Sequence, residues 1–319
     1  MGQSRFLLRL THFVVILSAM LPPATQARVP NQPPATLRRR RPTRLALTAA
    51  AVLAVSTTAA PAAEPLRVLP MGDSITYGET AAGSGTGGGT AVAGGYRDPF
   101  FAALTAAGVA VQLVGPSTDN PSPALAAAGQ AAHAGYRAWT VGDNVYSALD
   151  NLVFHAADWV HTYQPDVVLL HGGTNDLLML AGSAKTLTNL RRLLDRIFTA
   201  KPGVRVFVAG IIPVTRPDSA WVTDWDIRPY NLSIADEVVP DFRALGRDIH
   251  FVDQFANFTV AGAPVSAHLP DGIHPDAHGY ALMGATFADA AARSSVPEPA
   301  SALVLALAPW LCGRRRRRC

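Results

Sequence analysis

The sequence predicts an α/β protein of three layers, in which helices cover both faces of a parallel sheet of about five strands. Short runs of β-branched and other apolar residues recur between residues 63 and 295, and helical segments separate them. Runs that are apolar throughout are typical of parallel strands covered on both faces. The alternation of strands with helices favours a single α/β/α sandwich.

The expected elements follow one another in a regular order along the chain. Strands are expected at 66–71, 109–114, 166–171, 204–212 and 249–253, and helices near 97–107, 142–163, 184–200, 229–246 and 276–293. A glycine-rich loop at 79–95 contains Gly83, Gly85 and Gly88 in a dinucleotide-binding spacing. A dinucleotide-binding motif directly follows a strand and opens a helix, but these glycines are not flanked in that way. This argues against a dinucleotide site.

The N-terminal region has the pattern of a leader. Residues 37–63 give a basic segment, an apolar run and small residues, and Ala60-Pro61-Ala62 fits a signal-peptide cleavage site. We therefore expect residues 1–62 to be a leader that is cleaved near Ala62 after export. Residues 1–36 contain a second short apolar run, which indicates either a start site placed too far upstream or a double leader.

The C-terminal region, 296–319, has the pattern of a sorting or anchoring tail. Pro297-Glu298-Pro299 precedes an apolar run and then five arginines, Arg314–Arg318. The run is short for a membrane span, but the arginines would hold at an anionic membrane surface. The segment resembles the PEP-CTERM tails of Gram-negative bacteria, which an exosortase is thought to remove; an ordinary anchoring tail is the alternative.

These segments together imply export to the periplasm, the cell surface or the extracellular matrix. The implied partners are the export machinery, an exosortase-like processing enzyme and, transiently through the tail, the membrane.

The charge of the central region excludes one class of function. Of the 27 Lys and Arg residues, 13 lie in 1–62 or 296–319, whereas Glu298 is the one acidic residue of 23 there. Residues 63–295 therefore carry 14 basic and 22 acidic residues, a net charge of −8. Nucleic-acid binding needs a basic face, so it is not expected. Both cysteines, Cys312 and Cys319, lie in the tail, so no disulfide is expected in the central region.

Polar clusters follow three of the predicted strands. Ser74 follows the first strand, "HGGTNDL" (171–177) follows the third, and "DGIHPDAHGY" (271–280) follows the last after a loop. Ligands of such sheets bind beyond the carboxyl ends of the strands, so these clusters should meet at one edge.

The clusters contain the groups that acyl transfer requires. A serine hydroxyl becomes nucleophilic when a neighbouring base takes its proton, and His274 is the candidate base for Ser74. Asp271 would orient the imidazole and stabilise its cation. The side-chain amide of Asn175 and the backbone N–H of Ser74 could stabilise the oxyanion. Each motif alone also fits helix capping or turn formation, so their combination supports the catalytic interpretation.

At these residues the chain resembles the GDSL esterases, also called SGNH hydrolases, over 66–293. Gly72-Asp73-Ser74, Gly173-Thr174-Asn175-Asp176 and Asp271-Gly272-Ile273-His274-Pro275 match the family's first, third and last blocks. The resemblance implies a flavodoxin-like parallel sheet (the SGNH hydrolase fold), a Ser74–His274–Asp271 triad and Asn175 in the oxyanion hole. It also implies that no metal or organic cofactor is needed. Stretches such as "GYRDPFFAALTAAG" and "AHAGYRAWTVGDN" look like the acetyl-xylan esterase branch.

The second block departs from the family pattern. The family places a glycine there, whose N–H completes the oxyanion hole, but in the register set by Trp139-Thr140 this chain has Ala138. An alanine keeps the N–H but adopts positive φ less easily. The hole is therefore either strained or weaker, or Gly135 supplies the donor in a shifted register. Trp139 either lines the sugar side of the site or belongs to the core.

The function predicted from the sequence is an exported serine esterase that removes acetyl or similar short acyl groups from polysaccharide or a small ester. One alternative is a lipase or thioesterase acting on longer acyl chains. The other is a surface protein that keeps the fold and only binds carbohydrate.

Overall fold

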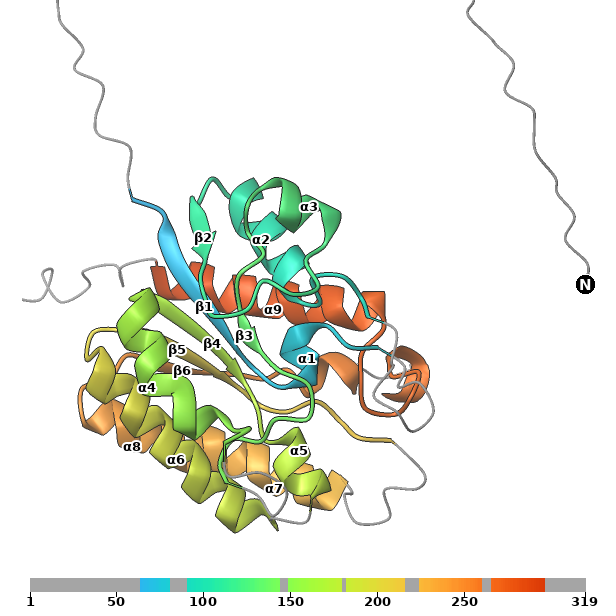
Figure 1. Ribbon diagram of the computed structural model, residues 1–319. Helices are drawn as coiled ribbons and strands as arrows, with labels where there is room; N and C mark the ends of the chain where they lie inside the picture. Colours follow the sequence, from blue (N-terminus) through green and yellow to red (C-terminus); the bar gives the residue numbers. More distant parts are fainter. Residues whose placement is uncertain are drawn as a thin grey trace, which may run out of the picture. The chain divides into compact units, whose positions relative to one another are not determined.

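The computed structural model describes residues 64–80, 91–143, 149–179, 182–215, 224–259 and 265–295 (Figure 1). The expected leader, residues 1–62, and the expected tail, residues 296–319, lie outside the described residues, as does most of the glycine-rich loop. Within these described ranges, no helix combines the length and the apolar character that crossing a membrane requires.

A parallel sheet forms the centre of the described domain and confirms the predicted fold class. Its strands lie in the order β2-β1-β4-β5-β6, with the bounds β1 Leu66–Gly72, β2 Val111–Leu113, β4 Val167–His171, β5 Arg205–Ala209 and β6 Ile249–Val252. All five predicted strands are present. A short additional strand, β3 (Ala134–Gly135), pairs with the end of β1.

The strand order places a switch point beside β1. The chain moves from β1 outward to β2 on one side and then returns to β4 on the other side of β1. The connections that leave the carboxyl ends of β1 and β4 therefore diverge, which opens space for a ligand between them. Ser74 and Asn175 follow these two strand ends directly.

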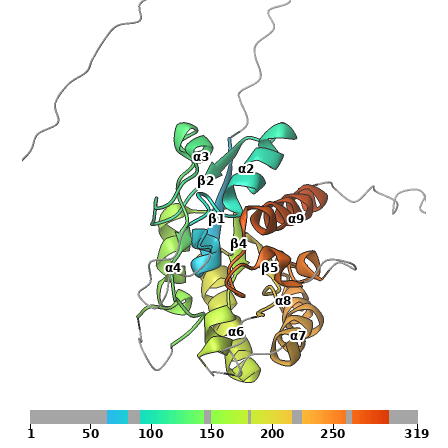
Figure 2. The same ribbon diagram turned by 90° about the vertical axis from the view of Figure 1, so that its right-hand side faces the viewer.

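Helices cover both faces of the sheet, as Figures 1 and 2 show from two sides. One face carries α2 (Arg97–Ala106) and α9 (Ala277–Ser295), and the other carries α4 (Leu152–Tyr163), α6 (Gly182–Ala200), α7 (Asp224–Ser233) and α8 (Val239–Ala244). Because successive side chains of a strand point to opposite faces, each strand supplies apolar residues to both layers. In β4, Leu169 faces the α2/α9 layer, and Val168 and Leu170 face the α4/α6 layer.

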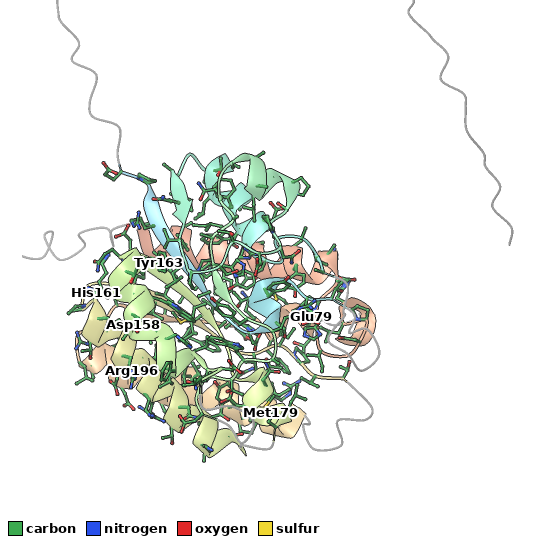
Figure 3. The ribbon with its side chains drawn as sticks, in the orientation of Figure 1. Glu79, Asp158, His161, Tyr163, Met179 and Arg196 are labelled. Carbon is green, nitrogen blue, oxygen red and sulfur yellow. The ribbon has the colours of Figure 1, made fainter. Side chains whose placement is uncertain are left out.

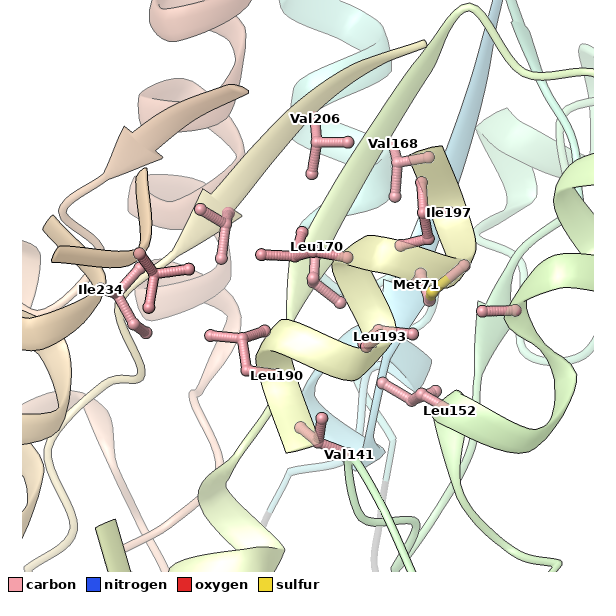
Figure 4. Packing of buried hydrophobic residues seen from close by; sticks show 14 of the residues in the cluster. Met71, Val141, Leu152, Val168, Leu170, Leu190, Leu193, Ile197, Val206 and Ile234 are labelled. Carbon is pink, nitrogen blue, oxygen red and sulfur yellow. The ribbon is translucent and has the colours of Figure 1, made fainter. Parts of the chain in front are cut away.

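The second of these layers contains the larger buried cluster (Figure 4). Leu190, Leu193 and Ile197 lie on one side of α6, at the spacing that brings side chains onto a common face, and they are fully or almost fully buried. They pack over Met71 of β1 and Leu170 of β4. The strands that carry the polar clusters are thus fixed against α6 through their apolar residues.

Two helix predictions were wrong in detail. The helix expected at 142–163 begins at Leu152, because the side chain of Asn151 accepts the N–H of Phe154 at 2.9 Å and caps the helix there. The helix expected at 229–246 is three segments: α7, a π-helical turn η1 (Ile234–Val238) and α8. Pro240 lies in the first turn of α8. A proline has no backbone N–H, so it cannot donate the hydrogen bond that an α-helix makes to the carbonyl four residues earlier.

Several short elements were not predicted. They are α1 (Ser74–Tyr77), α3 (Pro123–Ala127), α5 (Thr174–Leu178), η2 (Ala256–Phe258) and η3 (Val265–His268). Of these, α1 and α5 directly follow β1 and β4, so they determine how the polar clusters are presented.

Replacing Leu193 tests the importance of the α6 packing. Leu193 is 0% exposed, so Leu193→Ala should lower the free energy of unfolding by about 2.5–5 kcal/mol through lost burial and a residual cavity. Denaturant unfolding measures the change. Leu245→Ala is the matched control, because Leu245 is 69% exposed and its truncation should cost less than about 0.5 kcal/mol. Equal losses in the two variants would contradict this account of the core.

Candidate active site

The three polar clusters lie at the carboxyl-terminal edge of the sheet, as expected. Ser74 is the first residue of α1, immediately after β1, and Asn175 lies in α5, immediately after β4. Asp271 and His274 lie in the turns that precede α9. Residues from distant parts of the sequence therefore meet at one edge.

A continuous series of hydrogen bonds joins Ser74, His274 and Asp271. Ser74 Oγ lies 2.8 Å from His274 Nε2, and His274 Nδ1 lies 2.7 Å from Asp271 Oδ2. The other carboxylate oxygen of Asp271 accepts the N–H groups of Ile273 and His274 at 2.9 and 2.7 Å. Because Asp271 is an acceptor, the proton of a neutral imidazole belongs on Nδ1, which leaves Nε2 free to accept the serine proton.

Asp73 and Ser74 have different roles in the first cluster. The side chain of Asp73 accepts the N–H of Ile75 at 2.9 Å and caps α1, so the capping interpretation holds for the aspartate. Burial raises the pKa of Asp73 to about 7, against the lowering effect of that hydrogen bond and of His274. Asp73 is therefore substantially protonated near neutral pH, which limits the negative charge behind Ser74.

Two neighbouring residues of α5 hold the segment that contains Ala138. Asn175 Nδ2 donates to the carbonyl of Trp139 at 2.8 Å. Asp176 Oδ2 accepts the N–H of Val141 at 2.8 Å, and Asp176 also bonds to the N–H of Gly142. Burial raises the pKa of Asp176 to about 6, although these N–H groups oppose the shift. The amide nitrogen of Asn175 carries two hydrogens, so one remains for a ligand.

Ala138 occupies the conformation for which a glycine is better suited. Its φ is +60°, in the left-handed region, which costs a residue with a Cβ roughly 1–2 kcal/mol. The turn therefore needs the geometry that the family's glycine supplies. Ala138 is exposed, and its N–H forms no hydrogen bond with the residues that the structure describes.

Gly135 lies in β3, where it has a structural role instead of an oxyanion role. Its N–H donates to His133 Nδ1 at 2.9 Å, so this donor is already engaged. A Cβ at Gly135 would lie 2.6 Å from the backbone nitrogen of Tyr77, so the glycine allows β3 to approach α1 closely. His133 Nε2 lies 2.9 Å from the carbonyl oxygen of Asp119, and burial lowers the pKa of His133 to about 3.

The side chain of Trp139 packs in a group of stacked rings. Its centroid lies 4.2 Å from that of Tyr136 and 5.1 Å from that of His155, with interplanar angles of 18° and 27°. Trp159 lies 5.2 Å from His155 at 10°. Trp139 is half-buried against the core, so the packing favours a role in fixing the Ala138 turn over direct contact with a sugar.

Two charged residues at the site were not found from the sequence. Glu79 Oε2 lies 3.8 Å from His274 Nε2 and 3.5 Å from Arg137 Nε. Figure 3 labels Glu79, which lies beside α1 at the edge that carries the site. In the sequence, only the closeness of Glu79 to Ser74 along the chain could have indicated that Glu79 lies at the site. Among the described residues, no group of three or more His, Cys, Asp or Glu side chains could hold a metal ion.

The chain is similar to known esterases. The model of the GDSL-like lipase/acylhydrolase family matches residues 71–282. A multidomain esterase of Ruminococcus flavefaciens is 30% identical over 240 residues, which is 70% of this chain and 28% of that protein. The chain thus spans less than two thirds of the curated relatives it matches.

The fold also occurs in solved esterase structures. A family 3 carbohydrate esterase of Clostridium thermocellum aligns with a TM-score of 0.53 at 26% identity, covering 71% of this chain and 94% of that one. A carbohydrate esterase family 3 protein of Talaromyces cellulolyticus has a TM-score of 0.53 at 22% identity, with 73% and 100% coverage. At that identity, the second comparison supports the fold alone.

Replacing Ala138 tests the strain in the turn. Ala138→Gly should raise the free energy of unfolding by up to about 1 kcal/mol, because relief of the left-handed strain exceeds the added chain entropy. Ala102→Gly, in the interior of α2 and exposed, should instead lower it by about 1 kcal/mol. Thermal and denaturant unfolding of both variants measure the difference. If both substitutions are equally destabilising, the turn is not strained.

His133 should make stability depend on pH. Its folded pKa is depressed, so its contribution is complete above the unfolded value near 6.5 and is lost as the pH falls toward 3. At pH 5 the loss is about 2 kcal/mol, since 1.5 pKa units separate pH 5 from the unfolded value. His133→Gln does not titrate, so its deficit relative to the unchanged protein should shrink by about that amount between pH 7.5 and 5. A deficit that stays constant in denaturant titrations would show that His133 is not held neutral.

Proposed function

Because the chain belongs to the GDSL-like lipase/acylhydrolase family, we propose that it is a serine esterase in which Ser74, His274 and Asp271 form the catalytic triad. The observation that carries this proposal is the pair of short hydrogen bonds, 2.8 and 2.7 Å, that join the three side chains. Together they connect a nucleophile to a base and the base to an orienting carboxylate.

In the first half of the reaction, Ser74 Oγ attacks the ester carbonyl while His274 Nε2 takes its proton. Asp271 keeps the imidazole in the required tautomer and stabilises the cation that forms. The tetrahedral intermediate then collapses, His274 returns the proton to the leaving alcohol, and the acyl group remains on Ser74. Water later releases it by the reverse sequence of proton transfers.

Three donors would stabilise the oxyanion: the N–H of Ser74, the N–H of Ala138 and the second amide hydrogen of Asn175. Ser74 lies in the first turn of α1, where N–H groups have no partner within the helix. Ala138 is favoured over Gly135, because the N–H of Gly135 donates to His133. Losing one such donor typically raises the barrier by about 2.7–4 kcal/mol.

The proposed substrate is a short acyl ester, in particular an acetyl ester carried by a polysaccharide. Two comparisons support this choice: the carbohydrate esterase structure at 26% identity and the relative described as a multidomain esterase. The sequence stretches that look like the acetyl-xylan esterase branch agree with it. A lipase or thioesterase acting on longer chains remains the competing function within the same chemistry.

The proposed place of action is outside the cytoplasm of a Gram-negative bacterium. This proposal depends on the leader pattern of residues 1–62 and on the Pro-Glu-Pro, apolar and arginine segments of 296–319. An exported enzyme with a sorting tail would meet acylated polysaccharide at or beyond the cell envelope.

The test measures acetate release from acetylated xylan and p-nitrophenolate release from p-nitrophenyl esters. Ser74→Ala should lower kcat/KM by about 10⁴-fold or more, because it removes the nucleophile. The matched control is Ser294→Ala, which removes a hydroxyl at the end of α9 and should leave activity unchanged. Equal activity of Ser74→Ala and the unchanged protein would overturn the triad assignment.

The same assay separates the competing substrate classes. Along the series from acetyl to octanoyl p-nitrophenyl esters, kcat/KM should fall for a short-acyl esterase. A rise along the series would identify a lipase or thioesterase. Absence of turnover on every ester, with retained binding to xylan, would identify a carbohydrate-binding protein.

A further inference from the structure

Glu79 is a second carboxylate beside the imidazole of His274. Asp271 lies against Nδ1, whereas Glu79 Oε2 lies 3.8 Å from Nε2, the atom that exchanges protons with Ser74. The side chain of Glu79 is 10% exposed. A carboxylate this deeply placed needs a partner, and Arg137 Nε, at 3.5 Å, provides the positive charge.

The backbone of Glu79 is fixed to both halves of the site. Its N–H donates to the carbonyl of Ser74 at 3.0 Å. Its carbonyl accepts the hydroxyl of Tyr280, in α9, at 2.5 Å. Glu79 therefore holds a defined position relative to the nucleophile on one side and to the segment of His274 on the other.

The distance between Glu79 Oε2 and His274 Nε2 is too long for a direct hydrogen bond but suits a shared water. A polar separation beyond about 3.5 Å is commonly bridged by water. A water that donates one hydrogen to each of two acceptors, at about 2.8 Å each, holds them about 4.4 Å apart when both hydrogen bonds are straight, and closer when they bend slightly. The measured 3.8 Å fits this spacing. Such a water has both hydrogens engaged, so its lone pairs point away from the two acceptors.

We propose that Glu79 is a positioning residue for the water that hydrolyses the acyl-enzyme, an inference that rests on the proposed serine esterase function. The water donates one hydrogen to His274 Nε2 and the other to Glu79, whose carboxylate pairs with Arg137. Its oxygen then faces the acyl carbon carried by Ser74 Oγ, which lies next to Nε2.

The chemical step balances without any further reactant. The oxygen of the water forms a bond to the acyl carbon, and His274 Nε2 takes the proton on its side. The tetrahedral intermediate collapses as the bond between the acyl carbon and Ser74 Oγ breaks, and His274 gives its proton to Oγ. The products are the carboxylic acid and free enzyme. Glu79 accepts a hydrogen bond throughout and gains no proton.

The two half-reactions should therefore respond differently to Glu79→Gln. Acylation does not use the water, so kcat/KM on p-nitrophenyl acetate should stay within about two-fold of the unchanged protein. Deacylation should slow by about ten-fold or more, so kcat and KM should fall together. Stopped-flow measurements should show a burst of one p-nitrophenolate per enzyme, and mass spectrometry should show acetyl on Ser74.

Methanol provides a readout that a merely structural role would not change. Methanol has a single O–H group, which can donate its hydrogen bond to His274 Nε2. Its attack on the acyl-enzyme therefore does not depend on Glu79. The ratio of methyl acetate to acetate should therefore rise about ten-fold in Glu79→Gln. Glu79→Asp, which keeps the charge but withdraws the carboxylate, should shift the ratio in the same direction.

The control and the unfavourable outcomes separate this inference from the proposed function. Asp241→Asn removes a carboxylate from another ion pair with an arginine, Arg191, at 2.8 Å in an exposed position, and should change neither rate nor ratio. If Glu79→Gln and Glu79→Asp leave the methanol ratio unchanged, or lower kcat/KM as much as kcat, the water assignment is wrong. If Ser74→Ala is fully active in the same assay, the esterase mechanism itself is wrong.

Discussion

The hydrogen bond between Ser74 Oγ and His274 Nε2 is the interaction on which the site depends, and it joins residues 200 positions apart. No local structure brings them together. The parallel sheet does so, because it ends β1 and the other strands at one edge, and α9 begins at that edge. The hydroxyl of Tyr280 strengthens the connection by donating to the carbonyl of Glu79. The strand order is therefore a condition for the chemistry.

The segment around Ala138 shows how the surroundings maintain an unfavourable backbone conformation. Asn175 binds the carbonyl of Trp139, Asp176 binds the N–H of Val141, and the ring of Trp139 stacks on Tyr136. Each contact lies within three residues of Ala138. Strained backbone persists where neighbouring contacts over-determine it, and such positions cluster at functional sites. The loss of the family's glycine is thus compatible with an intact turn.

The sequence predicted the fold and the local motifs, but not the contacts that depend on three-dimensional packing. Apolar runs located all five main strands, and the motifs around Ser74, Asn175 and His274 identified residues that meet at one edge of the sheet, because each motif is contiguous. The start of α4 was placed too early because the helix begins at a side-chain cap, the hydrogen bond from the N–H of Phe154 to Asn151, which the sequence analysis did not identify. Glu79 was missed because its significance comes from its distances to His274 and Arg137, which no spacing in the sequence encodes.

The order of the site residues along the chain has a consequence for biosynthesis. The proposed nucleophile belongs to the first strand–helix unit, whereas the proposed base and its carboxylate precede the last helix, α9. A nascent chain that has emerged only as far as β6 presents Ser74 without a base, so the hydroxyl is inert. On the proposed mechanism, the enzyme therefore becomes competent only when synthesis of the domain is nearly finished, and a product that stops at the end of β6 would lack the base.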